Sequence, residues 1–329
     1  MARRLILCID GTWNSRAEET RFFVHPTNVQ RISELLVNDG KQQLVFYLRG
    51  VGTDSLVDRF VGGVWGAGIH GRVRDGYRIL CENYREGDQI ALIGFSRGAF
   101  AVRQITGVMA LIGLLKADRL NLFDGAFSLG MRRFARSIDN EESLFVSTNC
   151  HRPVPIRFLG VFDTVIRYGP FLALSRMILE RAMGRHIGFH DHVAPWFVVQ
   201  IAHALALDEC RINFEPWRYL QSEDWRQRVE ERWFAGHHSD VGGGCADSRA
   251  AEISLRWMAE CAQEAGLMFT EMPHVGDRSH CAPLNPSRIG AWRLMPFRRR
   301  VVEISDSIHP SVELRTNATG YRPFARCRF

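Results

Sequence analysis

The sequence lacks the long apolar runs and paired cysteine motifs that mark membrane, secreted and zinc-binding proteins. No apolar run approaches the ~20 residues that a membrane-spanning helix needs. The first run, Leu5 to Ile9, is too short for the core of a signal peptide and predicts a strand. The eight cysteines contain no C-x-x-C pair, so neither a zinc site nor a disulfide framework is expected. Because Cys8 lies in an apolar run, we expect a buried reduced thiol and a cytoplasmic protein, with export without a signal peptide left open.

An excess of one charge is also missing. Lysine and arginine number 42 against 36 acidic residues, a formal net charge of +6. The densest basic cluster is Arg298 to Arg300, and elsewhere basic residues interleave with acidic ones. This balance is typical of a solvated surface and disfavours nucleic-acid binding. Transient contact of the protein with an anionic membrane surface stays open.

The sequence does contain an alternation of short apolar runs with helical patterns, without repeats or low-complexity linkers. This alternation predicts a single α/β domain over residues 1–329, with a mainly parallel sheet flanked by helices on both faces. The predicted strands are residues 3–9, 42–48, 88–94, 155–162 and 232–236, with a short one at 300–305. The predicted helices are residues 28–37, 69–84, 97–115 and 250–266.

Two stretches interrupt the alternation, at about residues 120–150 and 168–230. Both are rich in aromatic and aliphatic residues, and we expect helical cap insertions that cover the carboxyl-terminal edge of the sheet. Within the second, residues 168–184 have an amphipathic pattern that fits either a core helix or a lid over an acyl pocket. His203 lies in a helix-like apolar run of the same stretch, which favours a packed core histidine over a catalytic base.

The string Gly94-Phe95-Ser96-Arg97-Gly98 follows a predicted strand and precedes a predicted helix. This is the pattern of a nucleophile elbow, in which a strained turn lifts the serine hydroxyl above the sheet. The two glycines are needed because side chains at their positions would collide with the neighbouring strand and helix. A serine that only caps the helix is the alternative. With both glycines present, the pattern favours Ser96 as a nucleophile.

A serine nucleophile needs a histidine base that a carboxylate orients. Asp163 ends the predicted strand 155–162, so it lies at the sheet edge where α/β active sites form. The base is expected in the segment that holds His237, His238 and Asp240, where glycines allow the backbone to turn tightly. The residues alone leave both histidines open as the base.

The oxyanion of an acyl-transfer reaction needs two backbone N–H donors. Arg97, which follows the serine, is expected to supply one of them. The second is expected from Gly11 or Thr12 in the loop after the first strand, where a glycine permits close approach. We expect Asp10 to brace this loop rather than to take part in the chemistry.

Neither a cofactor nor a metal ion is expected. The G-x-G-x-x-G string at residues 66–71 does not follow a predicted strand, so it does not indicate a dinucleotide site. The histidines His186, His190 and His192 lie close together in sequence, but no carboxylates accompany them at ligand spacing.

Four motifs together resemble a known family. They are CIDGTWN at 8–14, GFSRGAFAVR at 94–103, GVFDTV at 160–165 and FAGHHSDVGGG at 234–244. The combination resembles a family of α/β-hydrolases that includes the catalytic domains of phospholipase effectors exported by type VI secretion systems. The resemblance runs from about residue 4 to about 325. It implies an α/β-hydrolase-like fold with Ser96 as nucleophile and Asp163 as acid. It puts the base on the histidine directly before Ser-Asp-Val-Gly-Gly, which is His238.

Three functions compete at this point. The first is a serine hydrolase of carboxylic esters, with phospholipid acyl esters as the substrate that the resemblance suggests. The second is a metal-dependent phosphoesterase built on Asp10, His237, His238 and Asp240. The third is a non-catalytic binding module on a hydrolase scaffold, against which the complete Ser, Asp and His set argues.

Overall fold

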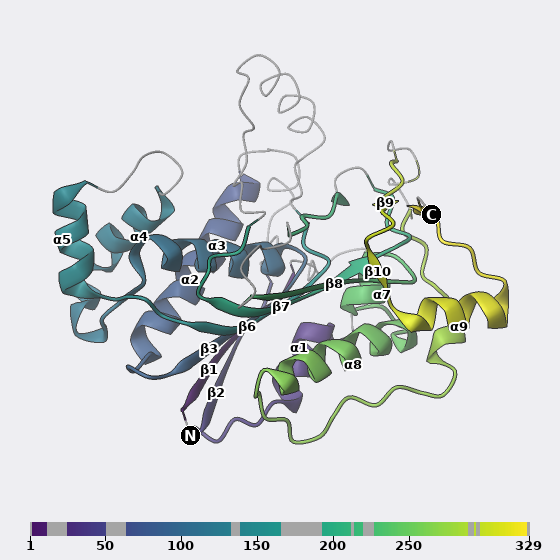
Figure 1. Cartoon of the computed structure of the whole chain (residues 1–329), viewed down its shortest axis with the longest axis horizontal. Coiled ribbons are helices and arrows are strands. Elements are labelled where there is room, and N and C mark those ends of the chain that lie inside the picture. The colour runs from purple at the N-terminus through teal and green to yellow at the C-terminus, as the bar shows by residue number, and fades with distance from the viewer. Residues whose placement is uncertain are drawn as a thin grey trace, which may run out of the picture.

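A computed structural model describes residues 2–11, 25–50, 64–132, 139–165, 193–211, 214–219, 227–288, 293 and 297–327. At its centre lies a seven-stranded parallel sheet in the order β10-β8-β7-β6-β3-β1-β2 (Figure 1). The strands are β1 (Arg4–Ile9), β2 (Gln43–Leu48), β3 (Gln89–Phe95), β6 (Ile156–Phe162), β7 (Val198–Ala206), β8 (Arg228–Phe234) and β10 (Ser307–Ile308). The parallel sheet of the α/β-hydrolase type is therefore confirmed.

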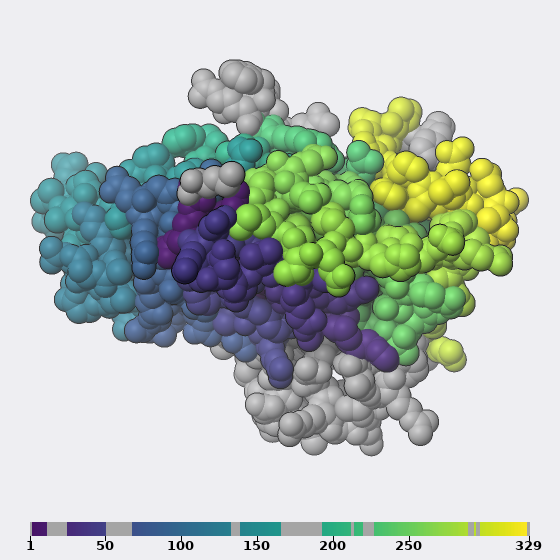
Figure 2. Space-filling model, turned by 90° about the horizontal axis from the view of Figure 1, so that it is seen from below, coloured from purple at the N-terminus to yellow at the C-terminus, as the bar shows by residue number. Residues whose placement is uncertain are grey.

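Helices cover both faces of the sheet (Figure 1). Helices α2 (Val64–Asn83) and α3 (Arg97–Ile112) lie on one face, and α1 (Asn28–Leu35) and α8 (Arg249–Glu264) lie on the other. On this second face, the purple amino-terminal part of the chain adjoins the green segment that carries α8 (Figure 2). The remaining described helices are η2 (Ala117–Leu122), α4 (Phe123–Met131), α5 (Asn140–Asn149), α7 (His238–Gly242), η4 (Ser279–Cys281) and α9 (Pro310–Thr319). None of the helices in the described part of the chain is long and apolar enough to cross a membrane.

The alternation of side chains along β1 explains why both faces are apolar. Leu5, Leu7 and Ile9 join the core beneath α2 and α3, whereas Ile6 and Cys8 join the core beneath α1 and α8. Successive side chains of a strand point to opposite faces, so a strand buried on both faces reads as a continuous apolar run. The carboxyl ends of the parallel strands then meet at one edge, from which α3 and α7 leave.

The prediction of a helix around His203 is wrong, because residues 198–206 form β7 in the middle of the sheet. Every residue of β7 except Val199 is buried. Burial on both faces removes the polar alternation that would identify a strand, so the apolar run resembled a buried helix segment.

The described residues of the first insertion form the helices η2, α4 and α5. Helix α4, however, packs against Val108 and Ile112 through Gly130. These residues lie toward the far end of α3 from Ser96, roughly 18 to 24 Å along the helix axis. The described helices of this insertion therefore pack away from the serine. The second insertion lies mostly outside the described residues, including the amphipathic segment 168–184.

Two short ladders complete the described structure. Strand β4 (Leu114–Leu115) pairs antiparallel with β5 (Cys150–His151), and β9 (Val301–Val302) pairs parallel with β11 (Arg326–Cys327). The expected strand at 300–305 is thus limited to two residues. The β9–β11 ladder packs with β8 and α9 around a third apolar cluster, next to the carboxyl edge of the sheet.

Candidate active site

Ser96 occupies a strained turn between β3 and α3. Its backbone has φ 56° and ψ −119°, a region that non-glycine residues rarely adopt. Its amide N–H donates to the carbonyl oxygen of Phe162 on the neighbouring strand, at 3.0 Å. The side chain makes no capping hydrogen bond to α3. A capping serine would spend its hydroxyl on the helix, so the alternative of a simple cap does not describe this turn.

The glycines on either side of Ser96 are required for space. A Cβ on Gly94 would lie 2.6 Å from the carbonyl oxygen of Gly98 and 2.7 Å from Ala99, in the first turn of α3. A Cβ on Gly98 would lie 2.1 Å from the carbonyl oxygen of Ile9, at the end of β1. The collisions expected with helix and strand are therefore both present.

Asp163 follows β6 at the same edge of the sheet and is fully buried. Its φ of 39° is again positive. Ser96 and Asp163 are the two non-glycine residues with positive φ among those that the structure describes. Backbone strain of this kind persists where surrounding structure enforces it, and it clusters at functional sites.

The carboxylate of Asp163 meets the imidazole of His238. His238 Nδ1 lies 2.6 Å from Asp163 Oδ2. The imidazole lies between two rings, with the Phe95 centroid at 4.6 Å and the Phe214 centroid at 5.0 Å. Because Phe95 immediately precedes Ser96, this packing brings the imidazole to the serine turn. His238 Nε2 is buried and has no hydrogen-bond partner among the described residues.

The protonation state of this pair follows from its surroundings. Burial raises the pKa of Asp163, but the charge of Arg300 and the bond to His238 outweigh it, so the pKa lies well below its ordinary value. Burial lowers the pKa of His238 below 6.5 and outweighs the pull of Asp163. At neutral pH the pair is thus an ionised carboxylate beside a neutral imidazole. The proton resides on Nδ1, and Nε2 carries a free lone pair.

Arg300 is a site residue that the sequence analysis did not identify. Its guanidinium clamps Asp163 with two bonds, Nη1 to Oδ1 at 2.6 Å and Nη2 to Oδ2 at 3.0 Å. Sequence analysis grouped it with Arg298 and Arg299 as one basic cluster and placed it at the start of a short strand. Those two are exposed, whereas Arg300 is only 6% exposed. The available signal was its place before the apolar pair Val301–Val302, where a short strand turns one arginine inward.

His237 belongs to a different network from His238. Its Nδ1 lies 2.8 Å from Asp240 Oδ2, and its backbone N–H donates to the same oxygen. Asp240 also accepts from the backbone and side-chain nitrogens of Asn285. This arrangement fastens the start of α7 to the loop at 285. Of the two candidate bases, only His238 contacts Asp163.

A second buried ion pair lies next to the backbone of His238, and sequence analysis did not identify it either. Arg211 contacts both carboxylate oxygens of Glu209, at 2.9 and 2.7 Å. Burial raises the pKa of Glu209, but Arg211 outweighs this effect and the pKa falls to about 2. The carboxylate also accepts a long bond of 3.4 Å from the backbone N–H of His238. The pair therefore helps to hold the first turn of α7.

The loop after β1 adjoins the serine. A Cβ on Gly11 would lie 3.1 Å from Ser96 Cβ. The Gly11 N–H donates to Asp10 Oδ1 at 2.7 Å, while Thr27 and Tyr47 donate to Asp10 Oδ2. Asp10 thus joins this loop to Thr27 and Tyr47. Thr12 lies outside the described residues, and Arg97 occupies the first position of α3.

The four residues of the metal hypothesis do not form one cluster. Asp10 bonds Thr27 and Tyr47, His237 bonds Asp240, and His238 bonds Asp163. Within the described ranges, no group of three or more His, Cys, Asp and Glu side chains is arranged to hold a metal ion. His203 also stays apart, because Glu231 and the backbone of Thr164 occupy its two ring nitrogens.

Comparisons with known proteins agree with the fold. The uncharacterized protein YEL023C of Saccharomyces cerevisiae is 26% identical in an alignment of 238 residues that covers 65% of this chain and 32% of that protein. The chain thus spans about a third of that relative's length. The structure of the Tle1 effector bound to the VgrG spike from the type 6 secretion system aligns with a TM-score of 0.50 and 16% identity. That alignment covers 84% of this chain and 78% of the effector chain.

An uncharacterized protein from Pseudomonas aeruginosa aligns with a TM-score of 0.47 and 18% identity, over 83% of this chain and 47% of its own. The family model described as the T6SS phospholipase effector Tle1-like catalytic domain matches residues 3–261. This match covers well over half of the chain, which therefore belongs to the family of Tle1-like phospholipase effector catalytic domains, a family of lipid-ester hydrolases.

Proposed function

We propose that this chain is a serine hydrolase that cleaves lipid acyl esters through an acyl-enzyme on Ser96. His238 acts as the base and Asp163 as the acid of the triad. One observation carries the proposal: His238 bonds Asp163 through Nδ1, while its buried Nε2 has no partner among the described residues and the ring packs on Phe95 beside Ser96. A nitrogen in this state is an acceptor for the serine proton.

The chemistry proceeds in two steps. Ser96 Oγ attacks the ester carbonyl while its proton moves to His238 Nε2, and the imidazolium then donates that proton to the departing alcohol. Water next attacks the acyl-enzyme with His238 again as base, which releases the fatty acid and restores Ser96. Asp163 stays ionised throughout and holds the proton of Nδ1 in place.

The oxyanion of each tetrahedral intermediate accepts from the backbone N–H of Arg97 at the amino end of α3. Gly11 and Thr12 are the candidates for the second donor. Because the Gly11 N–H donates to Asp10 Oδ1 in the free protein, it can serve only after leaving that carboxylate. Such a change would couple the loop after β1 to substrate binding.

An arginine–aromatic surface next to Arg300 supports contact with an anionic lipid surface. We define it as Arg288, Phe297, Arg298, Arg299 and Phe324. Phe297 is 52% exposed, and Arg288 and Arg299 lie over the rings of Phe297 and Phe324. An exposed aromatic ring accompanied by arginines suits the boundary between lipid headgroups and acyl chains. The contact between Arg298 and Glu215 is an exposed pair worth at most about 1 kcal/mol, so it leaves Arg298 available.

A fluorophosphonate probe tests the catalytic proposal. It should label Ser96 in the wild type, identified by peptide mass spectrometry, and should not label Ser96→Ala. Hydrolysis of esters of graded chain length should disappear in Ser96→Ala and should survive a chelator. Activity that persists in Ser96→Ala, or that a chelator abolishes, would refute the serine mechanism and favour the metal-dependent one.

Cosedimentation with vesicles tests the surface contact. The wild type should bind phosphatidylglycerol vesicles better than phosphatidylcholine vesicles, and rising salt should weaken the difference. Arg298→Glu with Arg299→Glu should abolish the preference. The matched control, Arg228→Glu with Arg256→Glu, reverses two exposed arginines on other elements and should preserve it. Equal loss in both double variants would show an effect of net charge alone.

A further inference from the structure

Both terminal nitrogens of the Arg300 guanidinium donate hydrogen bonds, whereas its Nε donates none to the described residues. Besides the two bonds to Asp163, Nη1 donates to the carbonyl oxygen of Ala206 at 2.9 Å and Nη2 to that of Phe214 at 2.6 Å. Nε is buried without a partner among the described residues. The guanidinium therefore joins the acid after β6 to the end of β7 and to the segment whose Phe214 ring contacts His238.

The carboxylate of Asp163 has no free hydrogen-bond acceptor site. Oδ1 accepts from Arg300 and from the backbone N–H of Ala206, and Oδ2 accepts from Arg300 and His238. A carboxylate offers about four acceptor sites, so each is used. The two bonds from Arg300 fix the plane of the carboxylate, since a bidentate pair leaves no freedom of rotation. That plane directs Oδ2 toward His238 Nδ1.

The charge of Arg300 explains how an acid can remain ionised with no exposed surface. An isolated carboxylate in such a position would take up a proton. A protonated Asp163 would no longer hold the proton on His238 Nδ1, and Nε2 would lose its role as acceptor. The same positive charge, however, makes the imidazolium form of His238 less favourable.

We propose that Arg300 is a positioning residue of the triad, which keeps Asp163 ionised and oriented toward His238 and restrains protonation of the imidazole. The inference rests on the proposed function. It assigns the least exposed arginine of the Arg298–Arg300 cluster to catalysis and the other two to the surface.

Several other titratable or charged groups lie near His238, and the test must leave them unchanged. Glu209 and Arg211 lie on the segment after β7, His237 caps the start of α7, and Asp240 lies within α7. Asp163 faces it from the end of β6. Since Arg300→Gln changes none of these groups, a shift in the pH profile reports the removed charge.

The experiment measures the rate of fluorophosphonate labelling and of ester hydrolysis against pH in Arg300→Gln and Arg300→Lys. Active-site titration with the probe normalises each rate to the folded fraction. For Arg300→Gln, we expect kcat to fall roughly 100-fold with little change in KM, because small displacements of a catalytic group cost about this much. The acid limb of the pH–rate profile of Arg300→Gln should move to higher pH by at least about 0.5 pH unit, because removal of a nearby positive charge raises the pKa of His238.

Arg300→Lys separates charge from geometry. Lysine keeps the positive charge but lacks the planar fork, so the acid limb should stay near that of the wild type while kcat falls about 10-fold. This variant also answers the question if Arg300→Gln fails to fold. Wild-type kcat in Arg300→Lys would overturn the positioning role.

Arg315 provides a matched control. It is 7% exposed, donates to two carbonyl oxygens, and has an unpartnered buried Nε, as Arg300 does. Arg315→Gln should lower the melting temperature and leave the acid limb and the normalised kcat in place. If Arg300→Gln behaves in the same way, Arg300 is merely structural and the inference is wrong. A wild type that is not labelled at Ser96 overturns the proposed function, and the inference with it.

Discussion

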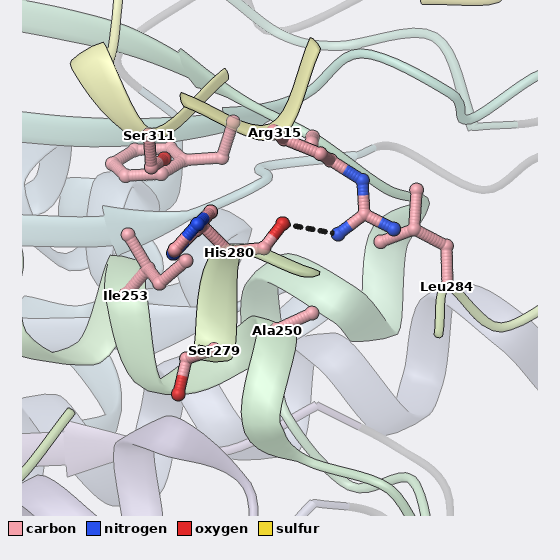
Figure 3. A pocket seen from close by; sticks show the side chains of 9 residues that line it. Ala250, Ile253, Ser279, His280, Leu284, Ser311 and Arg315 are labelled. Atoms are coloured by element: carbon pink, nitrogen blue, oxygen red, sulfur yellow. Dashed lines mark hydrogen bonds between the residues drawn. The ribbon is translucent and has the colours of Figure 1, made fainter. Parts of the chain in front are cut away.

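Two buried arginines divide the carboxyl-terminal part of the molecule into two corners. The Arg300 corner comprises Arg300 with Asp163, His238 and Phe214. The Arg315 corner comprises α9, η4 and a cavity of about 10 Å³. Arg315 donates there to the carbonyl oxygen of His280 (Figure 3), and it also donates to that of Ala282. The cavity has room for about one water molecule. Arg315 has no carboxylate within ion-pair distance in the described part of the chain, whereas Arg300 has Asp163 at 2.6 Å.

The two corners differ in backbone strain as well. Asp163 has a positive φ, which is sterically unfavourable for a residue with a side chain. In the Arg315 corner the residue with a positive φ is Gly320, which ends α9 and has no Cβ to clash. An arginine that only joins loops needs carbonyl oxygens and an unstrained frame. The buried pair of Arg300 and Asp163 lies beside a strained backbone and the neutral His238. Such an arrangement is unfavourable for folding, so it points to a functional role.

The histidines give the largest expected difference between the corners. His238→Ala should lower kcat/KM about as much as Ser96→Ala, by about 10⁴-fold or more, because members of a triad act as a unit. His280→Ala, in the lining of the cavity, should change it by less than about twofold. Steady-state kinetics on one short-chain ester measures all three. Comparable losses in His238→Ala and His280→Ala would abolish the distinction.

His237→Ala tests the assignment of the base within the Arg300 corner. His237 bonds Asp240 rather than Asp163, so we expect a loss below about tenfold, through weaker fastening of α7. A loss that matches Ser96→Ala, together with substantial activity in His238→Ala, would transfer the base to His237.

Glycine substitutions should change the free energy of unfolding differently in the serine turn and in the Arg315 corner. Gly98→Ala should cost about 3 kcal/mol of unfolding free energy and most of the activity, because the new Cβ would lie 2.1 Å from the Ile9 carbonyl oxygen. Gly320→Ala should cost about 1 kcal/mol without loss of activity, since its φ of 68° is strained for alanine but nothing lies within 4 Å. Urea unfolding with an activity assay measures both. Equal stability of the two variants would mean that the serine turn can relax.

Much of this site could be predicted from the sequence, because local motifs determine it. Gly94, Ser96 and Gly98 follow an apolar strand, and Asp163 ends another, so strand-to-helix chemistry places them at one edge. The pairing of Arg300 with Asp163 could not be predicted, since Asp163 lies 137 residues away and the inward direction of Arg300 depends on the β9–β11 ladder. Strand β7 was missed for a related reason: burial on both faces depends on its neighbours in the sheet.

Acid pH should weaken the fold through both corners. Burial lowers the pKa of His238 and lowers that of His309, which stacks on Phe234 beside the cavity, to about 4. Below about pH 6.5 the unfolded chain therefore binds protons that the folded chain does not, and stability falls as pH falls. The decline should steepen near pH 4, where Glu209 and Asp163 lose the stabilisation of their lowered pKa values.

His309→Asn separates the two contributions. Asparagine can still cap α9, where His309 Nδ1 accepts from the Ser311 N–H, but it does not titrate. The melting temperature of this variant should decline less between pH 7 and pH 5 than that of the wild type. The acid limb of activity should not move, because it reports His238. A displaced limb would show that the corners are electrostatically coupled.

The stability cost of Arg315→Gln should be small, because two tendencies oppose each other in this substitution. The substitution leaves the carbonyl oxygens of His280 and Ala282 without their donors and removes the guanidinium that lies 5.2 Å from the Tyr321 ring. Each lost bond costs about 1 kcal/mol and the ring contact about 0.5 kcal/mol. Removal of a buried charge without a carboxylate partner offsets part of this cost. We therefore expect a net loss of about 1–2 kcal/mol in urea unfolding. A loss above about 4 kcal/mol, the size seen when one member of a buried ion pair is removed, would mean that Arg315 is compensated by a charge as Arg300 is.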